Sequence, residues 1–149
     1  MKRILMIALT LMMCVCCFAS CAQIEHEIGK AVSVAAVEAV ADELAKEGVE
    51  YVLADEQALA DLTAEWSEYF EEGMAGEFTS GLEGRYENSE TGDWVEYLVL
   101  GFSATEDADA LEQVLLEKYD AEIKEGRALV VNGGYIVNLT VSSVVIEQE

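Results

Sequence analysis

The fold is decided by one stretch of the chain, Trp94-Val-Glu-Tyr-Leu-Val-Leu-Gly-Phe102. Its side chains alternate with a period of two, which is typical of a β-strand. One face of this strand would carry Trp94, Glu96, Leu98, Leu100 and Phe102, and the other Val95, Tyr97 and Val99. The sequence therefore predicts a strand over residues 94–102.

A helix is expected directly after this strand. Ser103 and Glu106 have the spacing of a capping box, in which each side chain bonds a free backbone amide at the start of a helix. The helix would run to about Lys124. Its inner side would hold Ala108, Leu111, Leu115 and Tyr119.

A β-hairpin is expected at the C-terminal end. Residues 128–131 and 135–145 are rich in β-forming residues, and they flank Asn132-Gly133-Gly134. Asn-Gly at this place favours a type I′ turn, which needs positive φ at both central residues. The more apolar side of the last strand is expected to pack against the helix at Leu111 and Leu115. That side comprises Tyr135, Val137, Leu139 and Val141.

The N-terminal part of the domain is expected to be helical. Apolar spacing predicts one helix from Ile28 to Glu47, with Gly48 as its C-terminal cap, and a second from Asp55 to Glu72, capped by Asp55 and ended by Gly73. Together they suggest an antiparallel helical hairpin. The segment Val49–Leu53 between them fits an early helical turn or a connector.

These expectations add up to an α+β fold, a helical hairpin followed by a ββαββ unit of antiparallel sheet and helix. Residues 28–149 would form a single domain. It would comprise the helical hairpin (28–72), a Gly-rich loop with a short strand near 82–87 (73–93), and the strand, helix and hairpin (94–149). Residues 21–27 would form a tether and residues 1–20 a signal peptide.

The N-terminus has the parts of an export signal. Met1-Lys2-Arg3 is basic, Ile4–Ala19 is an uncharged apolar run of 16 residues, and small residues follow. Phe18-Ala19-Ser20-Cys21 resembles the lipobox of bacterial lipoprotein precursors, although that motif usually begins with Leu. The resemblance implies lipidation of Cys21 and removal of residues 1–20. Ordinary cleavage that releases a soluble chain from Gln23, or an uncleaved membrane anchor, are the alternatives.

A second resemblance concerns the C-terminal third. The segment that starts at Trp94-Val-Glu-Tyr-Leu-Val-Leu and closes with Ala128-Leu-Val-Val-Asn-Gly-Gly-Tyr-Ile-Val-Asn-Leu-Thr-Val resembles the C-terminal half of a family of small uncharacterised bacterial lipoproteins of unknown function. The link between helix and hairpin is shorter here, and the helical front is longer. The family implies a lipid anchor, and it supplies no functional residues.

The charge balance excludes several partners. The chain has 30 acidic and 8 basic residues, and loss of Lys2 and Arg3 with the signal would leave a formal charge of −24. Nucleic acids are bound by neutralising their phosphates with Lys and Arg, so no nucleic-acid partner is expected. Anionic lipid headgroups would repel the domain as well. The membrane is therefore an expected partner only through the lipid on Cys21, which would attach the domain to it.

The common catalytic and metal sites have no counterpart in the sequence. The only histidine is His26, in the expected tether, and the other three cysteines lie in the signal. No glycine-rich phosphate motif occurs, so no cofactor is expected. The acidic run at Glu106, Asp107 and Asp109 lacks the ligand spacing of an EF-hand, so no metal site is expected.

Two classes of function remain open. The first is a non-catalytic binding module at the cell envelope, facing outside the cytoplasm, that binds an unknown envelope protein or polymer. The alternative is a small envelope hydrolase that uses carboxylates, for which Glu96 beside Trp94 is the candidate residue. Trp66, Tyr69 and Phe70 could bind a ligand, but their helical spacing favours the core. The absence of catalytic motifs favours the binding module and predicts no catalytic residues.

Overall fold

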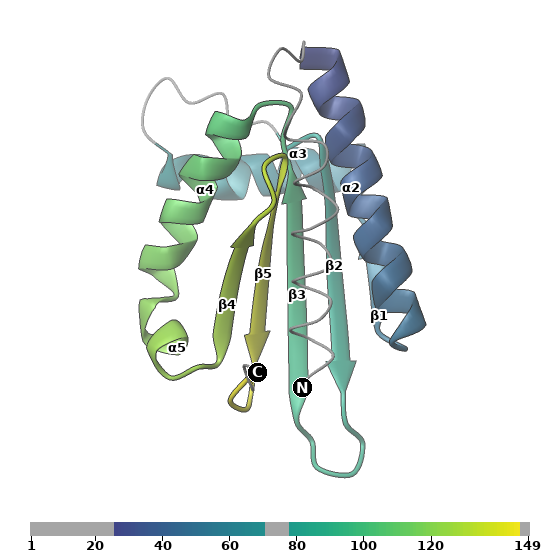
Figure 1. Ribbon diagram of the computed structural model, residues 1–149, viewed down its shortest axis with the longest axis vertical. Helices are drawn as coiled ribbons and strands as arrows, with labels where there is room; N and C mark the ends of the chain where they lie inside the picture. Colours follow the sequence, from purple (N-terminus) through teal and green to yellow (C-terminus); the bar gives the residue numbers. More distant parts are fainter. Residues whose placement is uncertain (1–25, 71–77, 147–149) are drawn as a thin grey trace.

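The computed structural model describes residues 26–70 and 78–146. Its elements in chain order are α2 (His26–Lys46), β1 (Glu50–Leu53), α3 (Glu56–Trp66), a 3-10 turn (Ser67–Tyr69), β2 (Ser80–Glu87), β3 (Trp94–Gly101), α4 (Thr105–Lys118), α5 (Asp120–Lys124), β4 (Ala128–Asn132) and β5 (Ile136–Ser142). The strands form one antiparallel sheet in the order β1-β2-β3-β5-β4 (Figure 1). The predicted α+β class is confirmed. No helix in the described ranges is long and apolar enough to span a membrane.

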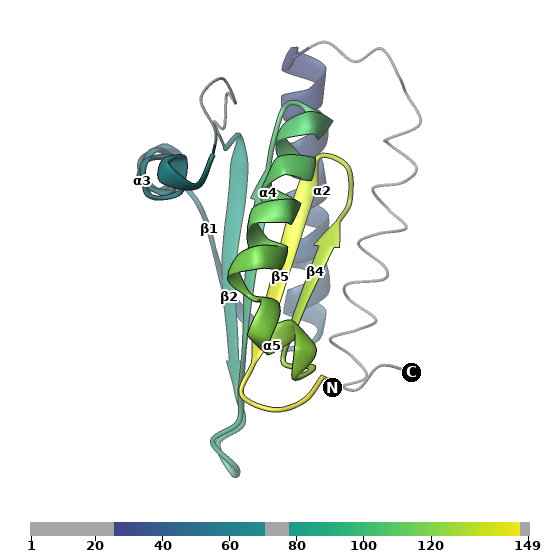
Figure 2. The ribbon, with the colours of Figure 1, turned by 90° about the vertical axis from the view of Figure 1, so that its left-hand side faces the viewer.

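Helices cover both faces of the sheet. In Figure 2 the strands lie between α3 and α2. The side of the sheet that carries Val95 and Val99 packs on α2, and we call it the α2 face. The opposite side, which carries Leu98 and Leu100, packs on α3 and α4, and we call it the α4 face. The predicted alternation along β3 is therefore confirmed, because both of its faces lie in a core.

The predicted helical hairpin is wrong. Val49–Leu53 is not a helical turn, because Glu50–Leu53 forms strand β1, which pairs with β2 at the edge of the sheet. Gly48 ends α2 with a φ of 75°, and the Val49 amide then bonds the Leu44 carbonyl. This glycine cap turns the chain into the sheet. The chain then crosses the sheet edge, so α2 and α3 lie on opposite faces.

The start of α2 is fixed by a close backbone contact. Gly29 is buried, and a Cβ at this position would lie 2.0 Å from the Ser103 carbonyl oxygen. One turn further, the Ser33 hydroxyl lies 2.7 Å from the Thr79 hydroxyl and donates to the Lys30 carbonyl. Only glycine permits the first contact. The helix is therefore held against the connection that leads from β3 to α4.

The helix after β3 differs from its prediction at both ends. It begins at Thr105, its N-cap residue Ala104 makes no side-chain bond, and the predicted capping box of Ser103 and Glu106 is absent. It also breaks at Tyr119, whose backbone leaves the helical region, into α4 and α5. The predicted second helix begins as expected, because Asp55 accepts a bond from the Ala58 amide at 2.8 Å. Its predicted end near Gly73 is wrong, because the α-helix stops at Trp66, a 3-10 turn follows, and the backbone of Phe70 is extended.

The turn between β4 and β5 is not type I′. Among the described residues only glycines have positive φ, and here that residue is Gly134. Asn132 stays in β4 because its side chain makes hydrogen bonds to α4. Its Nδ2 donates to Asp109 and to Glu112 on α4, each at 2.8 Å, and its Oδ1 accepts from the Gly134 amide. Tertiary bonds to α4 thus override the local preference of Asn-Gly.

The predicted inner side of β5 is confirmed for three of its four residues, whereas Tyr135 precedes β5 and is buried outside the cluster on the α4 face. Val137 and Leu139 lie in one cluster with Leu111 and Leu115 of α4, and Val141 packs against this cluster. The other side of β5 is buried as well. On that side the Asn138 Oδ1 and the Thr140 Oγ1 have no hydrogen-bond partner among the described residues.

Replacing Asn132 with alanine should destabilise the protein by about 1–3 kcal/mol, because it removes the two side-chain bonds that join the hairpin to α4 and the one that holds the turn at Gly134. Urea unfolding measures the change. Asn132→Asp is the matched control: it keeps the acceptor but adds a third carboxylate beside Asp109 and Glu112. It should cost at least as much as alanine, and part of its cost should disappear in high salt. An alanine variant as stable as the wild type would show that this clamp has no role.

Candidate binding groove

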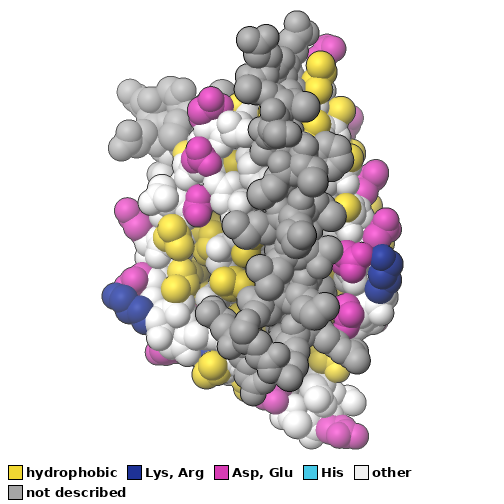
Figure 3. Space-filling model, in the orientation of Figure 1, with side chains coloured by type: hydrophobic (Ala, Val, Ile, Leu, Met, Phe, Trp, Pro, Cys, Tyr) yellow, Lys and Arg dark blue, Asp and Glu magenta, His cyan; other side chains and the backbone are white. Residues whose placement is uncertain are grey.

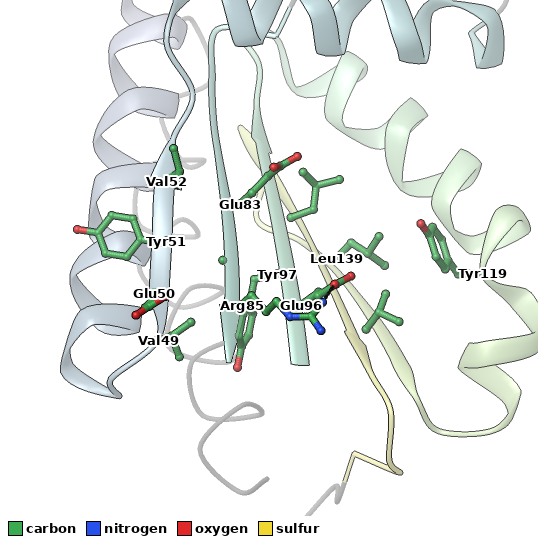
Figure 4. Close-up of a pocket in the computed structure, with 13 residues that line it drawn as sticks. Val49, Glu50, Tyr51, Val52, Glu83, Arg85, Glu96, Tyr97, Tyr119 and Leu139 are labelled. Carbon is green, nitrogen blue, oxygen red and sulfur yellow. Dashed lines mark hydrogen bonds and ion pairs between the residues drawn. The ribbon is translucent and has the colours of Figure 1, made fainter. Parts of the chain in front are cut away.

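An open groove lies on the α4 face, where α3 and α4 leave part of the sheet uncovered. Its volume is about 850 Å³. Figure 4 shows it between the β1–β2 edge of the sheet and α4. We call it the β1 groove, and its lining residues are Val49, Glu50, Tyr51, Val52, Glu83, Gly84, Arg85, Glu96, Tyr97, Leu98, Tyr119, Leu139 and Val141.

Strand register places these side chains in two rows. One row crosses the sheet through Val52, Glu83, Leu98 and Leu139, and the next through Glu50, Arg85, Glu96 and Val141. Residues in one row of antiparallel strands lie side by side on the same face. The β5 side of the groove is therefore apolar, and the charged side chains of the groove come from β1, β2 and β3. Tyr119, at the break between α4 and α5, stands on the α4 side of the groove (Figure 4).

One cation, Arg85, lies among the three carboxylates that line the groove, Glu50, Glu83 and Glu96. The Arg85 guanidinium donates to Glu96 on β3 and, at 3.3 Å, to Glu87 on β2. Its central carbon lies 5.5 Å from the centre of the Trp94 ring. The side chains of Arg85 and Glu96 are 51% and 50% exposed, so water screens the pair. With Glu50 and Glu83 in the lining, the groove carries net negative charge.

The outer border of the groove is an exposed apolar edge. Val52 is 72% exposed and Leu53 is 47% exposed, and both belong to β1. They point to opposite faces of the sheet, because successive side chains of a strand alternate. Large apolar side chains at the edge of a sheet favour contact with another chain.

The structure places the candidate residues from the sequence as follows. Glu96 lies in the groove, where Arg85 holds its carboxylate. Trp66 is buried and Phe70 packs on the same core, as their spacing predicted, whereas Tyr69 is 43% exposed. The Lys118 amine lies 4.5 Å from the centre of the Trp66 ring. Cys21 lies outside the described residues, and His26 is the first residue of α2.

The acidic run at the start of α4 has a structural role. Asp109 binds Asn132, as described above. Burial, with a smaller contribution from the charge of Glu106, raises the pKa of Asp107 above its ordinary value. Across residues 26–70 and 78–146, no cluster of three or more His, Cys, Asp or Glu side chains is arranged to hold a metal ion. Asp109 thus bonds the hairpin, whereas Glu106 and Asp107 lie in the first turn of α4.

Tyr97 gives the stability a dependence on alkaline pH. It is 4% exposed, and burial, followed by the negative charge of Glu47, raises its pKa from 10.0 to about 12. The folded state therefore keeps the phenol proton that the unfolded state loses above pH 10. The contribution of the protonated Tyr97 to the free energy of unfolding is complete below pH 10 and is lost as the pH rises towards 12.

We expect Tyr97→Phe to lose less stability than the wild type between pH 9 and pH 12, by on the order of 2 kcal/mol at the upper end. Urea unfolding of both proteins across this range measures the difference. Tyr86→Phe, at a tyrosine that is 44% exposed, is the matched control and should follow the wild type. Parallel curves for all three proteins would contradict the assignment to Tyr97.

No protein-family model, curated protein or solved structure matches this sequence. The groove is therefore characterised by its own geometry alone. Sequence reasoning found Glu96 but missed Glu50, Val52, Glu83 and Arg85. One sequence signal could have revealed strand β1. The run Tyr51-Val-Leu53 consists of β-forming residues and fits a short strand.

Proposed function

We propose that this protein is a lipid-anchored binding protein of the cell envelope, attached through Cys21, and that the β1 groove holds its ligand. One observation carries the binding role: a groove of about 850 Å³ with exposed apolar and charged side chains, built on the strands of the sheet. The anchor rests on the resemblance of residues 18–21 to a lipobox. Sites on strands are held in place better than sites on loops. A groove of this size fits a peptide segment or a small ligand.

The chemistry of the groove supports binding more than catalysis. Its charged groups are carboxylates and one guanidinium, and Glu96, the carboxylate proposed for hydrolysis, is already paired with Arg85 in contact with water. Hydrolysis by two carboxylates needs one that donates a proton and one that stays charged across the scissile bond. An ion pair that is half exposed serves better to orient a charged ligand.

The acidic surface of the protein supports a role in which the domain binds neither nucleic acid nor anionic lipid directly. The formal net charge of the chain is −22. In Figure 3 acidic side chains surround the visible face, whereas basic side chains gather at its two margins. Such a surface repels polyanions and attracts basic partners.

The anchor is tested by metabolic labelling with a fatty-acid analogue. The wild type should be labelled and should fractionate with membranes, and Cys21→Ser should do neither. Cys14→Ser is the matched control, because it removes a cysteine from the same segment and should leave labelling intact. A labelled Cys21→Ser, or an unlabelled wild type, would reject lipidation at this residue.

The groove is tested in cells by a photo-crosslinking amino acid at Val52. A discrete crosslinked species should form there and should be absent with the same amino acid at Glu38, an exposed position on α2. It should also disappear when Glu50 and Glu83 are both changed to lysine, since this reverses the charge of the groove. Equal crosslinking at both positions, or crosslinking that ignores the charge reversal, would reject the groove as the site.

A further inference from the structure

We propose that an extended polypeptide segment adds to β1 as a sixth, antiparallel strand along the outer border of the β1 groove, with basic and apolar side chains on the face that borders the groove. The inference rests on the proposed binding function and specifies the class of its ligand. Addition of a strand to a sheet edge supplies main-chain hydrogen bonds for affinity and side-chain contacts for specificity.

The backbone of β1 is oriented for this addition. β1 is an outermost strand, and its partner in the sheet is β2. The Ala54 amide donates to the Gly81 carbonyl on the β2 side, at 2.9 Å. Because neighbouring residues of a strand direct their N–H and C=O groups to opposite sides, those of Tyr51 and Leu53 point away from β2. Within the described residues no strand lies beyond them.

β1 has only part of the usual protection of a sheet edge. It is four residues long and carries the charged Glu50, but it lacks the lysine, proline or bulge that block many native edges. The chain has no proline, β1 has no lysine, and its pairing with β2 runs from Glu50 to Leu53 without a bulge. Instead, Val52 and Leu53 present exposed apolar surface. An added strand would cover both side chains and bond the outward groups.

The register of the sheet determines which side chains fit. A residue placed opposite Val52 would extend the row that continues through Glu83 and Leu98, and it should be apolar. A residue two positions away would lie opposite Glu50, on the same face, and it should be basic. Side chains directly opposite each other across an antiparallel pair have Cβ atoms about 5 Å apart, which is close enough for an ion pair of this kind.

Charge favours a foreign strand over a second copy of the chain. Two copies would each bring a formal charge of −22 and would place Glu50 of both close to the new strand pair. Like charges of this size oppose association, whereas a basic segment is attracted. The ligand is therefore a basic, extended segment of another polypeptide.

The test uses the full-length protein, purified from membranes in a non-ionic detergent at 150 mM salt, which about matches physiological screening. The probe is the peptide acetyl-Thr-Lys-Thr-Val-Thr-Lys-Thr-amide. With the valine opposite Val52, one lysine lies opposite Glu50 and the inner threonines lie opposite Tyr51 and Leu53. The peptide reads the same in both directions, so its polarity does not limit the fit.

Methylation of the backbone distinguishes strand addition from charge attraction. N-methyl groups on the two inner threonines would block the bonds to Tyr51 and Leu53, and affinity should fall at least about tenfold. The same groups on the two lysines point away from β1 and should leave affinity within about threefold. Equal effects of both methylations would overturn the proposal, since attraction between charges does not depend on which amides are free.

Two protein variants test the side-chain register. Glu50→Lys should weaken the peptide about tenfold, on the order of one charge-assisted bond. Glu38→Lys makes the same change in net charge on the exposed side of α2, and it should have a much smaller effect. If the two variants weaken binding equally, the peptide does not lie beside Glu50 and the proposal is overturned.

Hydrogen exchange followed by NMR locates the new strand. The amides of Tyr51 and Leu53 should exchange more slowly with the peptide bound, whereas that of Val52, which already faces β2, should change little. Protection of Tyr51 and Leu53 in a dimer without peptide would show that a second copy occupies the edge, and would overturn the proposal. A peptide that binds as described while crosslinking at Val52 fails in cells would reject the proposed function alone.

Discussion

Truncation of Phe102 to alanine should lower the free energy of unfolding by about 3–5 kcal/mol. Phe102 is 0% exposed and lies where β3 leads towards α4. Its ring packs edge-on against Phe78, with ring centres 5.2 Å apart, in the cluster that also contains Trp66 and Leu111. Alanine would leave a cavity that α3, α4 and the sheet all border, and such a site cannot collapse from one side.

Urea unfolding of wild type and Phe102→Ala measures this loss. Phe102→Leu should recover most of it, because leucine refills much of the volume. Val145→Ala is the surface control, since Val145 is 57% exposed, and it should change stability by less than about 0.5 kcal/mol. If Phe102→Ala were no more harmful than Val145→Ala, the packing on the α4 face would be wrong.

Leu44→Ala should cost about 2–5 kcal/mol, for the corresponding reason on the other face. Leu44 is 0% exposed in the cluster formed by α2 and the sheet. A Cβ added to Gly84 of β2 would lie 3.4 Å from its Cδ1, so the leucine packs directly on the strand backbone. Its removal would loosen α2 where the helix supports β1 and β2, beneath the β1 groove.

The same urea experiment measures the second loss, with Ile28→Ala at a 52% exposed position of α2 as its control. Leu44 and Phe102 belong to separate clusters on opposite faces, so their effects should add to within about 0.5 kcal/mol in the double variant. A large deviation from additivity would show that the two cores are coupled through the sheet.

The sequence predicted the elements whose structure depends on local pattern. The alternation along β3 identified both of its faces, and the apolar set Val137, Leu139 and Val141 gave the inner side of β5. Each of these strands repeats its pattern over seven or more residues. A period of two over that length is distinct from the helical period, so the pattern was sufficient.

The sequence misled where a distant contact decides the structure. β1 has four residues, too few to show a period, and its strand conformation depends on pairing with β2 about 30 residues later. Without β1, two neighbouring helical patterns suggest a hairpin. Asn132 is a similar case, because its bonds to Asp109 and Glu112 hold it out of the turn that Asn-Gly normally forms.

The groove could not be located from sequence because its rows are formed by pairing between strands. Glu50, Arg85 and Glu96 are neighbours across three strands but are far apart along the chain. Glu96 was singled out for its nearness to Trp94 in sequence, and its actual partner is Arg85. Register is set by the whole sheet, and a single strand does not contain that information.

The length of α2 sets a distance between the proposed anchor and the groove. Its 21 residues span about 30 Å, with His26 at one end and the turn that leads to Glu50 beyond the other. If Cys21 carries lipid, α2 acts as a rigid spacer. It can hold Glu50, and with it the charged side of the groove, away from the lipid headgroups. A segment that reaches β1 would then come from a neighbouring envelope layer or from a protein that projects at least this far from the same membrane.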